Sequence, residues 1–173
     1  MTGQVDHRVV EELLEVLGEA RRLHEELLAV LRRKLEAIRR AEMQAVHSCG
    51  AREALLVDRI RRNELRRRGL VERLGRQLAV PAGRARPVRL TELAEQLGEP
   101  MRSRLLVMAA GLRDLLGKIG DTNRVIGMVS EAMLEHFRQV YEAMRQAVPG
   151  SGLYSPAGRD TDDVRMNVLD AVG

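Results

Sequence analysis

Hydrophobic positions in the last third of the chain follow a heptad pattern. From residue 105 to 144 the seam positions recur at alternating steps of four and three residues: Leu105, Ala109, Leu112, Leu116, Ile119, Asn123, Ile126, Ser130, Met133, Phe137, Val140 and Met144. This spacing places one stripe of side chains on one side of a helix, where partner helices can pack against it. It predicts a long helix from about Met101 to Val148.

Two more amphipathic stretches precede this helix. The first predicts a helix from about Asp6 to Ser48, ended by Gly50, and its apolar stripe is wide enough to pack against more than one neighbour. The second predicts a helix over residues 51–79, with polar Asn63 and Arg67 interrupting its seam.

Short segments connect these helices. Residues 81–87 contain two prolines and a glycine, which indicates a linker. Residues 91–97 predict a short helix with Thr91 as its N-cap. The expected fold is all-α: an elongated antiparallel bundle or coiled coil of three long helices plus a short helix. We expect a bundle domain at residues 1–148 and a flexible, disordered C-terminal tail at residues 149–173.

Positive charge is concentrated between Arg59 and Arg89, in a chain whose formal net charge is +4. Such a segment can follow a phosphate backbone or form a solvated helix face. Stacking aromatics are absent from it, which favours the solvated face. A nucleic-acid partner is therefore the weaker reading, and it stays open as an alternative.

The chain shows no recognisable catalytic or metal-binding motif. Its four histidines are scattered, and the single cysteine, Cys49, excludes an internal disulfide. We expect no enzyme activity, no cofactor and no metal. An apolar run of membrane-spanning length and a signal pattern are both missing, so we expect no membrane insertion and a cytoplasmic location.

The long helix ends at a break, residues 149–152, that is followed by a short aromatic motif. Tyr154, Pro156 and Gly158 form a Tyr-x-Pro-x-Gly pattern. A heptad helix carrying Asn123, followed by this tail and by the apolar end at residues 167–171, resembles the FlgN family of flagellar export chaperones.

The resemblance implies a chaperone that binds amphipathic terminal segments of flagellar hook-associated (hook-filament junction) proteins and prevents their premature assembly. It also implies delivery of these proteins to the cytoplasmic platform of the flagellar type III export gate, with Tyr154, Pro156 and Gly158 docking there. Asn123 and Ser130 are polar seam residues. They either set the register of the bundle or contact a partner segment.

Candidate client-binding residues come from the last helix, where flexible methionines and aromatics exceed one face. They are Val129, Met133, Phe137, Val140, Tyr141 and Met144. The same residues fit an ordinary core equally well. A coiled-coil structural or oligomerisation protein, including a homodimer, would use the same heptads and remains the other alternative.

Overall fold

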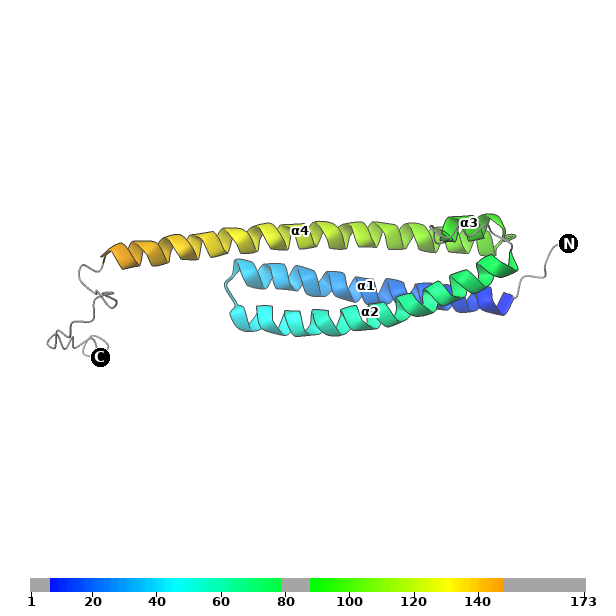
Figure 1. Ribbon diagram of the computed structural model, residues 1–173, viewed down its shortest axis with the longest axis horizontal. Coiled ribbons are helices and arrows are strands. Elements are labelled where there is room, and N and C mark those ends of the chain that lie inside the picture. The colour runs from blue at the N-terminus through cyan, green and yellow to red at the C-terminus, as the bar shows by residue number, and fades with distance from the viewer. Residues whose placement is uncertain (1–6, 79–87, 148–173) are drawn as a thin grey trace, which may run out of the picture. The chain divides into compact units, whose positions relative to one another are not determined.

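The computed structural model describes residues 7–78 and 88–147. Four helices make up this part of the chain: α1 (His7–Arg39), α2 (Met43–Gln77), α3 (Leu90–Glu95) and α4 (Met101–Ala147), with no strand among the described residues (Figure 1). The predicted all-α fold of three long helices and one short helix is confirmed. The predicted linker at 81–87 and the tail at 149–173 lie outside the described residues.

The chain divides into two compact units, Met1–Leu134 and Glu135–Gly173. The first unit holds α1, α2, α3 and α4 up to Leu134. The described part of the second unit is the rest of α4, residues 135–147. The expected domain limits, 1–148 and 149–173, stay a prediction.

A tight turn at Ala41 joins α1 to α2. Ala41 has a left-handed backbone conformation, with φ of 54°. Its N–H donates to the Ile38 carbonyl at 3.0 Å, and the Glu42 N–H donates to the Ala37 carbonyl at 2.9 Å. These two bonds satisfy carbonyls at the end of α1 in the manner of a Schellman turn. The prediction of one helix as far as Ser48 is therefore wrong, and Gly50 lies inside α2.

Helix α1 is the central element of the first unit, because it contributes to both hydrophobic clusters. One cluster joins α1 to the end of α2, to α3 and to the start of α4 around Leu13, Leu17, Leu74, Leu93 and Leu105. The other joins α1 to the first half of α2 and the middle of α4 around Leu27, Leu31, Leu56, Ile119 and Ile126. The wide apolar stripe predicted for the first helix is thus used on more than one side.

The buried side of α4 differs in part from the predicted seam. Leu105, Ile119 and Ile126 are buried as expected, but Leu115 is buried in place of Leu116, which is 51% exposed. The packed positions follow the steps Leu105, Met108, Leu112, Leu115, Ile119, Ile126, Val129 and Met133. Two alternating four-and-three patterns share residues 105, 112, 119, 126 and 133, and the structure packs the second.

The N-cap of helix α3 lies two residues earlier than predicted. Its N-cap is Arg89, whose backbone N–H donates to a Glu92 carboxylate oxygen at 3.0 Å. Thr91 is therefore the second residue of the helix, and its assignment as N-cap is wrong. Leu93 and Ala94 are fully buried in the first cluster, which fixes this short helix to the bundle.

Candidate functional site

The apolar residues of α4 in the second unit are exposed. Phe137 is 57% exposed, Val140 43%, Tyr141 69% and Met144 64%. Their spacing of three, four and seven residues places them on one side of the helix. The described part of this unit is a single helical segment, so the unit offers no described second element to cover them. We call these four residues the α4 apolar face.

Polar side chains on the rest of this segment interact with one another. Arg138 pairs with Glu135 at 3.1 Å, and Arg145 pairs with Glu142 at 2.9 Å. Gln139 and Gln146 donate to the same two carboxylates at 3.1 and 3.2 Å. The hydrogen bond from Arg145 lowers the pKa of the Glu142 carboxyl. The charged and amide groups thus stay together, away from the apolar face.

Two of the predicted client-binding residues lie in the first unit. Val129 and Met133 are partly buried and pack against the second hydrophobic cluster. The structure therefore separates the predicted set, with two residues packed in a core and four on the α4 apolar face. Such a face can bind an amphipathic helix that lays its own apolar stripe against it.

The predicted polar seam residues, Asn123 and Ser130, differ in burial from Asn63, the one buried polar side chain among residues 7–78 and 88–147. Asn123 is exposed and Ser130 is partly buried. The buried amide is that of Asn63, which is 7% exposed and donates from Nδ2 to the Val16 carbonyl at 3.2 Å. Asn63 joins α2 to the backbone of α1. A register role for Asn123 or Ser130 stays a prediction.

A ladder of ion pairs links α1 to α2. Glu12 pairs with Arg66 at 3.8 Å, Glu19 with Arg59 at 3.7 Å, and Glu26 with Arg52 at 3.1 Å. Each step of seven residues forward along α1 matches a step of seven backward along α2, as an antiparallel helix pair requires. Part of the basic segment therefore pairs with glutamates of this chain.

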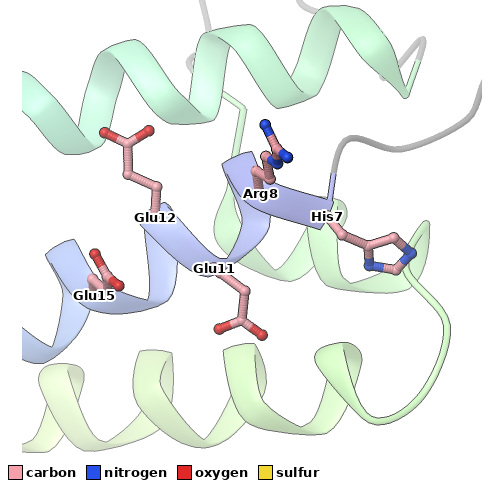
Figure 2. Close-up of a pocket in the computed structure, with 5 residues that line it drawn as sticks. All are labelled: His7, Arg8, Glu11, Glu12 and Glu15. Atoms are coloured by element: carbon pink, nitrogen blue, oxygen red, sulfur yellow. The ribbon is translucent and has the colours of Figure 1, made fainter.

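An open hollow near the start of α1 is lined by His7, Arg8, Glu11, Glu12 and Glu15. Figure 2 shows Glu12 directed toward α2 and Glu11 directed toward α4. Glu12 is in the ladder, and Glu11 pairs with Arg104 at 3.0 Å. These two carboxylates are already paired with arginines of α2 and α4, so we assign the hollow no ligand.

Glu64 accepts three hydrogen bonds from arginines on its own helix. Arg67 donates at 2.6 and 2.8 Å, and Arg68 donates at 2.8 Å. The bond from Arg67 is the main reason that the pKa of Glu64 falls from 4.5 to about 2, against the opposing effect of burial. The same bond raises the pKa of Arg67. The Glu64 carboxylate therefore offsets part of the positive charge of Arg67 and Arg68 within the basic segment.

Metal and membrane signals are missing from the part of the chain that the structure describes. Residues 7–78 and 88–147 contain no group of three acidic, histidine or cysteine side chains placed to hold a metal ion. None of the helices in these ranges has the length and apolar character needed to cross a membrane.

The sequence analysis did not identify the glutamates of α1 that pair with arginines of α2. It also did not identify Leu134 and Val107, which are 66% and 70% exposed. The seven-residue spacing of Glu12, Glu19 and Glu26 against Arg52, Arg59 and Arg66 was the available signal for the ladder. The sequence gives no comparable signal for Leu134 and Val107, because exposed and buried apolar residues on a helix are the same residue types.

A comparison with protein-family models matches residues 1–162 to the FlgN family, described as FlgN protein. The match includes all described residues and extends over Tyr154, Pro156 and Gly158, which lie outside them. No match to the chain is found among curated proteins or among solved structures. A match over most of the chain, together with the all-α fold, leads to one conclusion: the chain belongs to the FlgN family of flagellar export chaperones.

Proposed function

We propose that this chain acts in the cytoplasm as the carrier of flagellar hook-associated proteins, called clients below. It holds the amphipathic terminal segment of a client, prevents premature assembly, and delivers the client to the export gate. The observation that supports the holding step is the α4 apolar face, where Phe137, Val140, Tyr141 and Met144 are exposed on one side of one helix.

The chemistry of this face suits such a segment. An amphipathic client helix can bury its apolar stripe against Phe137, Val140 and Tyr141, as helices do in hydrophobic grooves. Met144 adapts its shape to different side chains, which allows more than one client sequence. Ordering a disordered segment costs about 2–5 kcal/mol of the gross interaction energy. The resulting affinity is moderate, as a carrier that must release its client requires.

Delivery is assigned to the tail. Tyr154, Pro156 and Gly158 lie beyond the described residues, and the family match covers all three. An aromatic side chain outside the helical face is suited to anchor the tail to a partner. In this proposal the helix binds the client, the tail contacts the cytoplasmic platform of the export gate, and no catalytic residue, cofactor or metal takes part.

The experiment that tests this division of labour compares Tyr154→Ala with Ser155→Ala, a neighbouring tail change outside the motif. Client affinity is measured by calorimetry with a terminal segment of a hook-associated protein, and delivery is measured as secreted client in culture supernatant. Tyr154→Ala should bind the client like the wild type yet secrete less, while Ser155→Ala should change neither. The division of labour is wrong if Tyr154→Ala abolishes client binding. If Tyr154→Ala changes neither quantity, the tail has no delivery role.

A further inference from the structure

Helix α2 keeps an excess of positive charge after its ion pairs are counted. Residues 55–76 include eight arginines and three acidic residues, which gives a net charge of +5. Glu12 and Glu19 of α1, which pair with Arg66 and Arg59, reduce the net charge of this surface to +3. The basic segment is therefore only partly neutralised by the ladder to α1.

Two arginines of this segment are not engaged by the described part of the chain. Arg62 and Arg76 are exposed and form no ion pair within residues 7–78 and 88–147. Of the acidic residues on the same helix, Asp58 pairs with Arg61 at 3.5 Å. The guanidinium groups of Arg62 and Arg76 are thus available to an anionic partner.

Two exposed leucines lie beside these arginines. Leu55 is 60% exposed and Leu65 is 68% exposed. Helical spacing places Leu55, Arg62, Leu65 and Arg76 on one side of α2, which we call the α2 outer face. The buried residues of α2 lie on another side of the helix; they include Leu56, Asn63, Leu70 and Leu74.

The combination of arginine and leucine restricts the kind of partner. A nucleic-acid backbone matches the charge but offers little apolar surface to the leucines, and residues 55–76 include no aromatic side chain to stack on bases. An anionic lipid surface matches both, because its phosphates accept hydrogen bonds from arginine and its acyl boundary accepts apolar side chains. Clusters of about four to eight basic residues on an amphipathic helix are typical of such contacts.

From this combination we propose that the α2 outer face contacts the surface of an anionic membrane. Arg62 and Arg76 bind lipid phosphates, Leu55 and Leu65 enter the acyl boundary, and no helix crosses the membrane. The choice of a membrane over an acidic protein rests on the proposed function, because delivery ends at the cytoplasmic platform of an export gate, beside a leaflet that carries anionic lipids. A charge of +3 with two leucines makes the contact weak and reversible, so the carrier can leave the membrane again.

The test measures cosedimentation of the full chain with vesicles at physiological salt. One set of vesicles contains equal parts of phosphatidylglycerol and phosphatidylcholine, and the reference set contains phosphatidylcholine alone. The wild type should bind the mixed vesicles and not the reference set. Arg62→Gln with Arg76→Gln should weaken binding at least about tenfold, because two phosphate contacts are lost. Leu55→Gln with Leu65→Gln should weaken it at least about threefold, because apolar burial is lost.

The matched control is Arg32→Gln with Arg113→Gln, which removes the same charge from exposed positions on α1 and α4. It should bind within about twofold of the wild type, because salt screens charges that do not touch the lipid. Circular dichroism checks that every variant keeps its helices.

The outcomes separate the membrane contact from its alternatives. A wild type that binds neither set of vesicles, or both equally, overturns the proposal. A control that loses as much binding as Arg62→Gln with Arg76→Gln also overturns it, since the charge then acts through the whole molecule. If the leucine variant binds like the wild type, while the wild type binds RNA in a salt-dependent way that the arginine variant loses, the face belongs to a nucleic acid.

Calorimetry with a client terminal segment keeps this proposal distinct from client holding. The arginine variant should bind the client like the wild type. Client binding without vesicle binding overturns the membrane contact alone. Vesicle binding by a chain that binds no client supports the membrane contact and contradicts the proposed function.

Discussion

Glu64 and Asn63 are neighbours on α2 that satisfy their polar groups in different ways. Glu64 collects hydrogen bonds from Arg67 and Arg68 on its own helix, whereas Asn63 reaches across to the backbone of α1. Sequence reasoning identified Asn63 and Arg67 as interruptions of an apolar seam. It could not assign their partners, because helical spacing gives only the side of the helix on which a residue lies.

Replacing Glu64 by Gln should destabilise the protein in a pH-dependent way. The folded-state pKa of about 2 lies below the ordinary value of 4.5, so the carboxylate contributes its full stability above pH 4.5 and loses it as the pH falls toward 2. Partial exposure screens the arginine bonds, which reduces the expected loss at pH 7 to about 1 kcal/mol. Urea denaturation of both proteins at pH 7 and at lower pH measures this difference.

Glu72→Gln is the matched control, since Glu72 is an exposed glutamate on the same helix. It should change the free energy of unfolding by no more than about 0.5 kcal/mol at pH 7. The gap between wild type and Glu64→Gln should shrink as the pH falls below 4.5. A gap that stayed constant or grew toward acid pH would contradict the assignment of the hydrogen bonds to ionised Glu64.

Helix positions were largely predictable at the scale of elements, and helix partners were not. The predicted limits of α4, residues 101–148, agree with the observed Met101–Ala147 because a proline follows and the heptads run without a break. The turn between α1 and α2 was missed because Ala41, which is neither Gly nor Asn, takes the left-handed conformation. Only part of the packed side of α4 was predicted, because its apolar residues fit two heptad patterns. Leu105, Ile119 and Ile126 are buried as expected, whereas Leu115 is buried in place of Leu116.

Leu115 and Leu116 provide a direct test of which pattern packs. Leu115 is 8% exposed and Leu116 is 51% exposed, although the two are adjacent and chemically identical. Leu115→Ala should cost about 2–5 kcal/mol of unfolding free energy, because it removes buried apolar atoms and leaves a cavity. Leu116→Ala should cost less than about 1 kcal/mol. Chemical denaturation measures both, and equal losses would mean that the seam predicted from Leu116 also packs.

At the scale of the whole molecule, the same apolar periodicity serves two purposes in different units. In the first unit the packed positions of α4 complete cores with α1, α2 and α3. In the second unit Phe137, Val140, Tyr141 and Met144 are exposed. Sequence reasoning selected these four residues together with Val129 and Met133. It could not separate the two groups, because heptad spacing indicates that a helix face is apolar and not whether a neighbour covers it.

The most direct measurement of the central claim is the affinity of a client terminal segment for variants of the α4 apolar face. Tyr141→Asp with Met144→Asp places two carboxylates on that face. Gln139→Asp with Gln146→Asp places the same charge on the opposite side of the same helix and serves as the control. The altered side chains are all exposed, so the melting temperatures should stay close to that of the wild type.

Calorimetry should show that the double change on the face weakens client binding at least about tenfold, because it removes apolar contacts and desolvates a charge. The control should bind within about twofold of the wild type. This outcome would place the client on Phe137, Val140, Tyr141 and Met144. Wild-type affinity in the Tyr141→Asp, Met144→Asp protein, with its helices intact, would contradict the account and move the client to another surface.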